Sequence, residues 1–124
     1  MKILIIDDQP MILKTLHHKL SHAGYDIAAA TDGRQAISTF DTEQPDLVIL
    51  DLLLPFAMGF EVLHYIRHKK LSQVPVLILS TVGLESSVIE AFDLGADDYI
   101  TKPFRPSEML ARVKRKLPNS ALAQ

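Results

Sequence analysis

Three short runs of purely aliphatic residues constrain the fold of this chain more than any other feature. They occupy residues 3–6, 47–50 and 76–79, and each contains only Ile, Leu and Val, with no alternating polar residue. A strand of this kind is apolar on both sides and must be covered on both sides, which is typical of parallel sheets packed between two layers of helices. The runs therefore predict an α/β protein.

Amphipathic segments between the runs predict the helices that cover the sheet. The apolar spacing predicts helices from Pro10 to a stop at Gly24, and over residues 33–40, 60–69, 86–94 and 106–117. Weaker strands are expected at residues 25–30 and 97–101. Five strands that alternate with five helices predict a doubly wound, five-stranded parallel sheet with right-handed crossovers.

The composition excludes several classes of function. The 124 residues suffice for one domain, and the formal net charge of −2 gives no electrostatic basis for binding nucleic acid or an acidic membrane surface. The chain has no cysteine, which excludes a disulfide or thiolate metal site. Asp51 and Pro55 interrupt the longest apolar region, so we expect no membrane span, and the four apolar residues before Asp7 are too few for a signal peptide. The lack of cysteine agrees with the cytoplasmic location that we expect.

Carboxylates follow two of the aliphatic runs. Asp7 and Asp8 end the first run, and Asp51 ends the second. Functional groups of an open α/β sheet gather at the carboxyl ends of its strands, so neighbouring strands would bring these acids together. Two unit charges ~4 Å apart repel by about 4 kcal/mol at an effective dielectric of about 20. The cluster therefore requires a positive group, either Mg²⁺ or Lys102, which follows the fifth predicted strand.

Hydroxyls reach the same predicted edge, because Ser80 and Thr81 follow the third aliphatic run, which is the fourth predicted strand. Taken alone, an Asp-Asp pair is more often a helix cap or a solvated loop, and a Lys-Pro pair is usually a surface turn. Asp51 differs because it interrupts an apolar run, where an unpaired buried charge is costly. Acids, a lysine and hydroxyls on one edge favour a site that receives a phosphoryl group.

Four motifs in order carry a resemblance to a known family. They are IIDDQP, DLVILDLLLP followed by Gly59, PVLILST and GADDYITKPF. Over residues 2–117 the chain resembles the receiver domains of two-component response regulators. The resemblance implies a flavodoxin-like sheet of strand order 2-1-3-4-5 and a receiver domain over residues 1–118, with residues 119–124 beginning a linker or a disordered tail. It also implies phosphorylation by a sensor histidine kinase or a histidine phosphotransfer protein.

The resemblance assigns expected roles to the acids. Asp51 matches the aspartate that accepts the phosphoryl group as a nucleophile. Asp8 matches the direct Mg²⁺ ligand and Asp7 a ligand acting through water, with the phosphoacceptor carboxylate and the backbone carbonyl of Leu53 completing the protein ligands. Such a domain modifies itself and is not an enzyme with outside substrates.

The resemblance also implies the parts of a switch. Lys102 matches the lysine that pairs with the phosphoryl group, and Pro103 matches the proline after it, often cis in this family. Ser80 and Tyr99 match the switch hydroxyl and the switch aromatic, which together change the surface formed by the fourth helix, fifth strand and fifth helix. Thr81 stands where the family usually has a smaller residue, so Ser80 and Thr81 both remain candidates for the switch.

Several residues depart from the family pattern. Phe56 and Met58 make the loop after the phosphoacceptor more apolar than usual, which indicates either neutral variation or a partner-binding surface. Leu53 and Val82 flank the predicted phosphoryl site, and neither side chain can position an attacking water. We therefore expect slow autodephosphorylation.

Charged residues near the fourth and fifth helices resemble the dimer surface of regulators that carry a winged-helix domain. These residues are Asp93, Asp98, Glu108, Arg112 and Lys114. Val88 stands where a basic residue would pair with Glu108 in such a dimer. Two interpretations therefore remain open: the domain dimerises when it is phosphorylated, or these charged side chains are simply exposed to solvent. His64 and His68 are four residues apart on the third helix, and we expect them to be solvated rather than metal ligands.

Three other functions compete with this interpretation. A phosphatase or phosphotransferase with an aspartyl-phosphate intermediate usually has a second Asp two residues after the nucleophile, where this chain has Leu53. A flavin-binding protein of similar topology would need a hydroxyl-rich phosphate loop after the first strand, where the acids would instead repel a phosphate. A pseudo-receiver usually lacks one key acid or the lysine, and this chain has them all.

Overall fold

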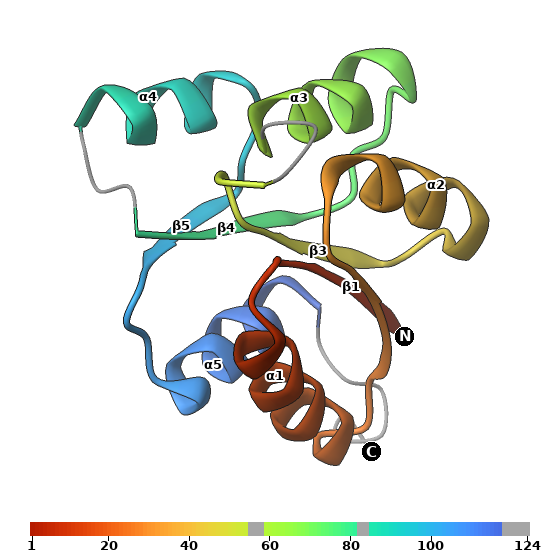
Figure 1. Ribbon diagram of the computed structural model, residues 1–124, viewed down its shortest axis with the longest axis vertical. Helices are drawn as coiled ribbons and strands as arrows, with labels where there is room; N and C mark the ends of the chain where they lie inside the picture. Colours follow the sequence, from red (N-terminus) through yellow and green to blue (C-terminus); the bar gives the residue numbers. More distant parts are fainter. Residues whose placement is uncertain (55–58, 82–84, 118–124) are drawn as a thin grey trace.

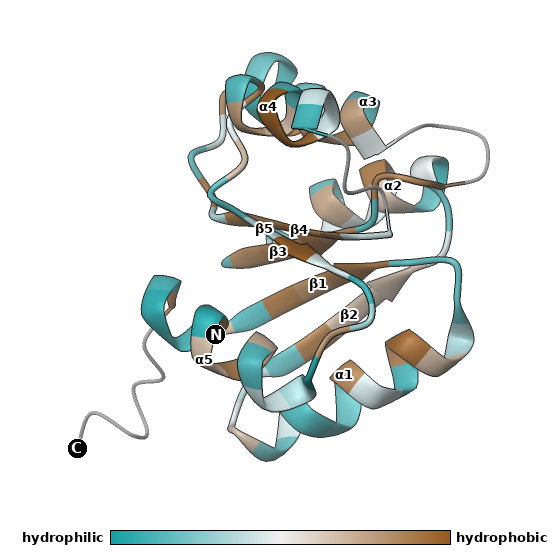
Figure 2. Cartoon of the chain, turned by 90° about the vertical axis from the view of Figure 1, so that its left-hand side faces the viewer, coloured by the Kyte–Doolittle hydropathy of each residue, from teal (hydrophilic) through white to brown (hydrophobic). Residues whose placement is uncertain are grey.

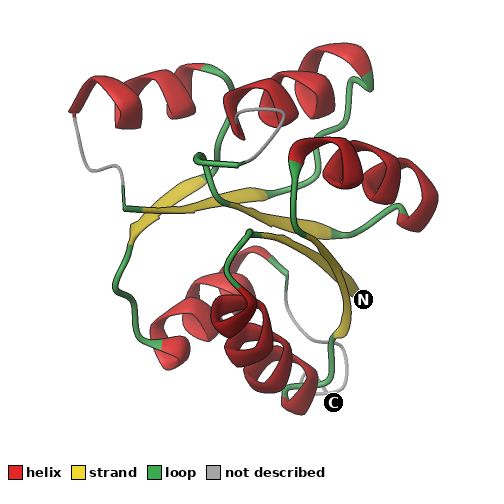
Figure 3. Cartoon of the chain, in the orientation of Figure 1, coloured by secondary structure: helices red, strands yellow, loops and turns green. Residues whose placement is uncertain are grey.

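The chain forms a single five-stranded parallel sheet in the computed structural model, which describes residues 1–54, 59–81 and 85–117. The strands are β1 (Lys2–Ile6), β2 (Asp26–Ala30), β3 (Leu47–Leu50), β4 (Val76–Ser80) and β5 (Asp98–Thr101). They pair in the order β2-β1-β3-β4-β5, all parallel, as Figures 1 and 3 show. The predicted fold class and strand order are confirmed.

Helices cover both faces of the sheet. They are α1 (Pro10–His22), α2 (Gly33–Glu43), α3 (Gly59–His64) with a π-helical turn η1 (Tyr65–Lys69), α4 (Glu85–Asp93) and α5 (Pro106–Lys116). Figure 1 shows α1 and α5 on one face and α2, α3 and α4 on the other. Of these described helices, none has the length and apolar character needed to cross a membrane.

Alternate residues of each aliphatic strand enter two separate cores. In β1, Ile3 and Ile5 pack into the core shared with α1 and α5, whereas Leu4 and Ile6 pack into the core shared with α2 and α3. All four side chains are fully buried. In Figure 2 the brown central strands lie between helices that carry much of the hydrophilic teal. Burial on both faces explains why the strands show no polar alternation.

Most element boundaries lie within one or two residues of the predicted ones. Gly24 has φ 98° and follows Ala23, the C-cap residue of α1, which confirms it as the stop. The helix predicted to end at Phe40 continues to Glu43, and Gln44 then ends it with φ 48°. The helix predicted over residues 60–69 changes to a π turn at Tyr65, with Lys70 N donating to the Tyr65 carbonyl at 2.9 Å.

Candidate functional site

The three acids meet at the carboxyl edge of β1 and β3. These strands pair directly, with Ile6 opposite Leu50, so the residues that follow them emerge side by side. Backbone hydrogen bonds continue the pairing, because Asp51 N donates to the Ile6 carbonyl at 2.9 Å. One carboxylate oxygen from each of Asp7, Asp8 and Asp51 lies within 4.8 Å of the others. The predicted convergence of the acids is confirmed.

Two of these acids are buried, which makes their charges costly. Asp7 is 1% exposed and Asp51 is 5% exposed, whereas Asp8 is exposed. Asp51 Oδ1 accepts a hydrogen bond from Leu53 N at 3.0 Å. Burial raises the pKa of Asp7 above its ordinary value, and the nearby charge of Lys102 only partly offsets this effect.

Lys102 brings a positive charge into the acid cluster. Its backbone N–H donates to the Ser80 carbonyl at 2.9 Å, which fixes the end of β5 beside β4. Its Nζ lies 2.8 Å from Asp7 Oδ2 and 3.0 Å from Asp51 Oδ2. Burial works against the ammonium, but the two carboxylates outweigh burial and raise the pKa of Lys102. The lysine is therefore a fixed cation in the pocket.

The donor set also fits a hard divalent cation. Asp7 Oδ2 is buried and accepts no hydrogen bond from the part of the chain that the structure describes, although it lies beside the Lys102 ammonium. A buried carboxylate oxygen that has a cation beside it and no other donor is suited to face a metal ion or its bound water. The cluster offers carboxylate oxygens only, as magnesium and calcium sites do.

Comparison with known proteins identifies the family of a chain with this fold and acid pocket. The family described as the response regulator receiver domain matches residues 3–114. This chain belongs to the receiver domain family. Receivers are parts of two-component response regulators, and they are not conventional enzymes.

Similar proteins include regulators of transcription and solved receiver structures. The chain is 43% identical over 122 residues to the alkaline phosphatase synthesis transcriptional regulatory protein PhoP of Bacillus subtilis, covering 98% of this chain and 50% of that protein. It is 45% identical to the transcriptional regulator RpaA of Synechocystis, covering 94% of this chain and 48% of that protein. The receiver therefore spans about half the length of the curated relatives it matches.

Two solved structures illustrate the shared fold. A response regulator from Chloroflexus aurantiacus has a TM-score of 0.86 and 35% identity, covering 95% of this chain and 98% of that one. The BeF3-activated N-terminal receiver domain of Klebsiella pneumoniae RstA has a TM-score of 0.88 and 28% identity, covering 96% of this receiver and 100% of that chain.

The two predicted switch residues of this receiver lie on adjacent strands. Ser80 ends β4 and is fully buried, whereas Thr81 after it is exposed. Tyr99 lies on β5, is half-buried and packs against the core on the α2–α3 side of the sheet. Burial raises the pKa of Tyr99, while a hydrogen bond with Ser80 lowers it. The tyrosine and the serine are therefore in direct contact.

Two residues in the pocket have contacts that the sequence did not reveal. Gln9 Oε1 accepts a hydrogen bond from Lys102 Nζ at 2.9 Å. Gly59 lies against the Asp51 backbone, where an added Cβ would be 2.5 Å from the Asp51 carbonyl oxygen. The position of Gly59 just after the second motif was a signal for the second contact. No sequence signal indicated the contact between Gln9 and Lys102.

The peptide bond between Lys102 and Pro103 is cis, as it often is in this family.

Some of the predicted surface charges pair within the chain. Arg112 Nη1 donates to both Asp98 carboxylate oxygens at 2.8 and 2.7 Å, and Arg112 Nε lies 3.6 Å from Glu108 Oε1. Asp93 and Lys114 are exposed. The predictions for Phe56, Met58, Val82 and residues 119–124 lie outside the described residues.

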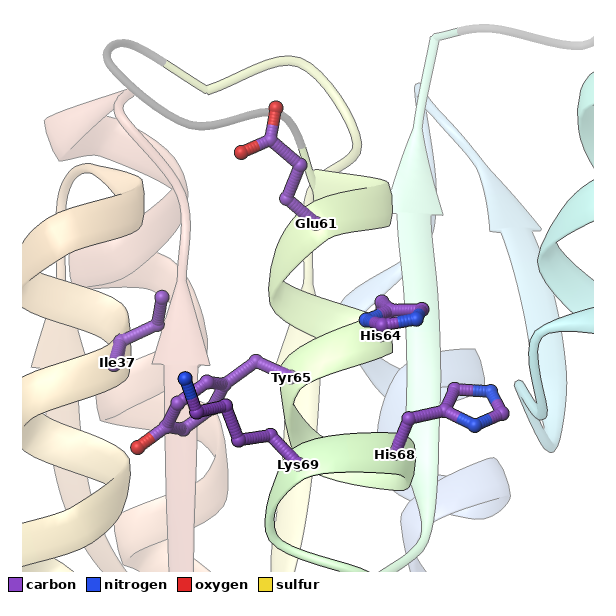
Figure 4. Close-up of a pocket in the computed structure, with 6 residues that line it drawn as sticks. All are labelled: Ile37, Glu61, His64, Tyr65, His68 and Lys69. Atoms are coloured by element: carbon purple, nitrogen blue, oxygen red, sulfur yellow. The ribbon is translucent and has the colours of Figure 1, made fainter.

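A surface hollow beside α3 is separate from the acid pocket. Its volume is about 580 Å³, and it is lined by Ile37, Glu61, His64, Tyr65, His68 and Lys69, none of which belongs to the acid cluster. Figure 4 shows His64 and His68 on one side of the helix, with Tyr65 and Lys69 on the other. The two imidazoles are exposed and stack with ring centroids 4.6 Å apart.

Proposed function

We propose that this receiver accepts a phosphoryl group on Asp51 from a sensor histidine kinase or a histidine phosphotransfer protein. The observation that carries the proposal is the position of the Asp51 carboxylate, buried within 4.8 Å of two other acids and 3.0 Å from Lys102 Nζ. A carboxylate in this setting combines a nucleophile with a nearby cation.

The transfer exchanges one bond to phosphorus for another. A carboxylate oxygen of Asp51 forms a bond to phosphorus while the phosphorus–nitrogen bond of the donor phosphohistidine breaks, and the electron pair of that bond stays on the imidazole. Lys102 remains protonated and stabilises the negative charge of the phosphoryl oxygens. The backbone N–H of Leu53 donates to Asp51 Oδ1 and orients the carboxylate.

Mg²⁺ is the cofactor that we assign to the acid cluster. Asp8 and Asp51 would hold it directly, Asp7 through water, and the backbone carbonyl of Leu53 would add a further ligand. When bound, the cation neutralises charge shared between the carboxylates and the phosphoryl oxygens. The buried Asp7 Oδ2, which has the Lys102 ammonium beside it and no other donor in the described part of the chain, supports this assignment.

The response to phosphorylation would pass through Ser80 and Tyr99. The aspartyl phosphate offers new acceptor oxygens, and the Ser80 hydroxyl would turn toward one of them and release its contact with Tyr99. A change of a two-state equilibrium from 1:99 to 99:1 needs about 5.5 kcal/mol, which a few charge-assisted hydrogen bonds of ~1.5–3 kcal/mol each can supply. The altered surface is that of α4, β5 and α5.

We also propose that this surface pairs with a second copy after phosphorylation. Ile89 and Phe92 of α4 are 51% and 45% exposed, and they offer apolar area on the α4 part of this surface. The Asp98–Arg112 pair would have to be shared with the partner copy. Sedimentation of the phosphorylated and unphosphorylated protein tests this proposal, which fails if both forms have the same mass.

The wider setting is also a proposal. Residues 1–118 would form a cytoplasmic receiver, with residues 119–124 leading into a linker. The relatives named above are transcriptional regulators about twice as long as this chain, which supports an output that another domain supplies. DNA binding would then belong to that domain and not to this one.

Intact mass after incubation with acetyl phosphate and Mg²⁺ tests the phosphoacceptor. We expect a gain of one phosphoryl group in the wild type and in Asp26→Asn, an exposed acid at the start of β2, but not in Asp51→Asn. Chelation of Mg²⁺ should abolish the gain. A wild type that binds Mg²⁺ and gains no mass would contradict phosphorylation of Asp51. Failure to bind Mg²⁺ as well would indicate a pseudo-receiver.

A further inference from the structure

Gln9 occupies a helix-capping position but does not cap its helix. It is the N-cap residue of α1, with an extended backbone at φ −93° and ψ 113°, and its side chain makes no capping hydrogen bond. Short polar side chains (Ser, Thr, Asp or Asn) at this position accept a hydrogen bond from the first turn of their own helix, whereas the longer Gln9 side chain extends away from that turn. The side-chain oxygen instead accepts a hydrogen bond from Lys102 Nζ at 2.9 Å, across 93 positions of sequence.

The backbone of Gln9 is fixed on both sides of this contact. Its N–H donates to Asp7 Oδ1 at 2.9 Å, which ties it to the acid cluster. Its carbonyl accepts from Ile12 N and Leu13 N at 3.1 and 3.2 Å, which ties it to the first turn of α1. The side chain therefore extends toward the lysine from an anchored point.

The ammonium of Lys102 has three N–H donors, and it has three oxygen neighbours among the residues that the structure describes. Two of these neighbours are the carboxylates of Asp7 and Asp51, and the third is the neutral amide oxygen of Gln9. Phosphorylation and metal binding change the charge and the partners of both carboxylates. The Gln9 amide is neutral, so neither a metal ion nor a phosphoryl group replaces its charge as they do for the carboxylates.

We propose that Gln9 is a positioning residue for phosphoryl transfer, which holds the Lys102 ammonium over Asp51 while the carboxylates exchange partners. This inference rests on the proposed roles of Asp51 and Lys102. Without the amide oxygen of Gln9, the Lys102 ammonium contacts only the two carboxylates. When the carboxylates change partners, the ammonium would then move with them and leave the position where it meets the phosphoryl oxygens. Gln9 is exposed, so replacing its side chain leaves both cores intact.

Mobility of the lysine is the first readout, and it needs neither metal nor phosphodonor. Nitrogen-15 relaxation of the Lys102 ammonium, assigned with Lys102→Met, would be compared among wild type, Gln9→Met and Gln9→Glu. Gln9→Met has a similar length and no acceptor, whereas Gln9→Glu keeps an acceptor oxygen. We expect the ammonium to become mobile in Gln9→Met and to stay ordered in Gln9→Glu. Gln73→Met, at an exposed loop position, is the matched control and should resemble the wild type.

The phosphorylation rate is the second readout. With Mg²⁺ and acetyl phosphate, we expect the maximal rate of Gln9→Met to fall by about tenfold, the equivalent of one charge-assisted hydrogen bond, with little change in the half-saturating donor concentration. If the ammonium stays ordered in Gln9→Met, or if it becomes mobile while the phosphorylation rate stays unchanged, the proposed role of Gln9 is wrong. Neither result would affect the proposed role of Asp51. A wild type that takes no phosphoryl group would overturn both the role of Gln9 and the phosphoacceptor.

Discussion

The Lys102 ammonium lies 2.8 Å from Asp7 Oδ2, a buried oxygen that accepts no hydrogen bond from the described part of the chain. The same ammonium lies 3.0 Å from Asp51 Oδ2. One lysine therefore compensates two buried carboxylates from two different strands. Removal of the Lys102 ammonium would leave both carboxylates without this cation. The stability of the metal-free domain should therefore depend on Lys102, and so should the effect of adding Mg²⁺.

Lys102→Met should destabilise the metal-free domain by about 1–3 kcal/mol, because it leaves buried carboxylates unneutralised. Mg²⁺ should recover more stability in this variant than in the wild type, since the cation replaces the missing charge. Urea unfolding with and without Mg²⁺ measures both effects, and Lys14→Met on the exposed side of α1 is the control. Equal Mg²⁺ effects in the two proteins would contradict the prediction.

The contribution of Lys102 should also have a defined pH range. Its pKa is raised in the folded protein, so its stabilising effect is complete below the ordinary lysine value of 10.5 and is lost as the pH rises through the raised value. The stability difference between wild type and Lys102→Met should therefore persist at pH 9 and shrink only in more alkaline solution.

Asp7→Asn should stabilise the metal-free domain at neutral pH. Burial raises the pKa of Asp7, so the folded protein binds a proton at this carboxyl more readily than the unfolded chain does, and its ionised form opposes folding. The gain over wild type should shrink as the pH falls through the raised pKa, because the wild-type carboxyl then becomes neutral as well. Urea unfolding at a series of pH values measures this trend.

Asp26→Asn, at an exposed carboxylate, should show no comparable gain. The same variants also report on the metal site, since the stabilisation by Mg²⁺ should be weaker in Asp7→Asn and normal in Asp26→Asn. A loss of stability in Asp7→Asn at neutral pH would mean that the ion pair with Lys102 outweighs the cost of burial.

Gly59→Ala should slow phosphorylation of Asp51. An added Cβ would lie 2.5 Å from both the Asp51 carbonyl oxygen and Leu52 Cα, so the backbone that carries the proposed nucleophile has to shift. We expect the phosphorylation rate with acetyl phosphate to fall by roughly tenfold or more, because small displacements of reacting groups are costly. Gly95→Ala is the control for lost stability. It places a side chain at φ +105° against the flexible Arg67 side chain and should destabilise the fold with little effect on this rate.

The sheet and its acid cluster could be predicted because they depend on pattern and topology. Aliphatic residues on both faces of β1 require two cores, and paired strands bring Asp7 and Asp51 to one edge whatever the surrounding side chains do. The π turn could not be predicted, because one extra residue barely alters the apolar spacing of a short helix. The Gln9–Lys102 contact depends on side-chain conformations across the sheet edge, and local sequence does not encode them.

Leu53→Asn should shorten the lifetime of the phosphorylated receiver. Leu53 follows Asp51 by two residues, its N–H donates to the Asp51 carboxylate, and its side chain is 46% exposed, so it lies at the entrance to the pocket without a polar group. An amide in its place could accept and donate hydrogen bonds to a water that attacks the phosphoryl group. We expect severalfold faster decay of the phosphorylated form after the donor is removed, followed by intact mass.

Leu71→Asn provides the matched control for this experiment. Leu71 is 76% exposed and lies in the loop after η1, with φ 51°, a conformation that asparagine tolerates. Both variants replace an exposed leucine with the same amide, but only Leu53 adjoins the nucleophile. Faster decay in Leu53→Asn alone would show that an apolar residue at this position prolongs the signal. Equal lifetimes in all three proteins would mean that access of water, and not its orientation by residue 53, limits hydrolysis.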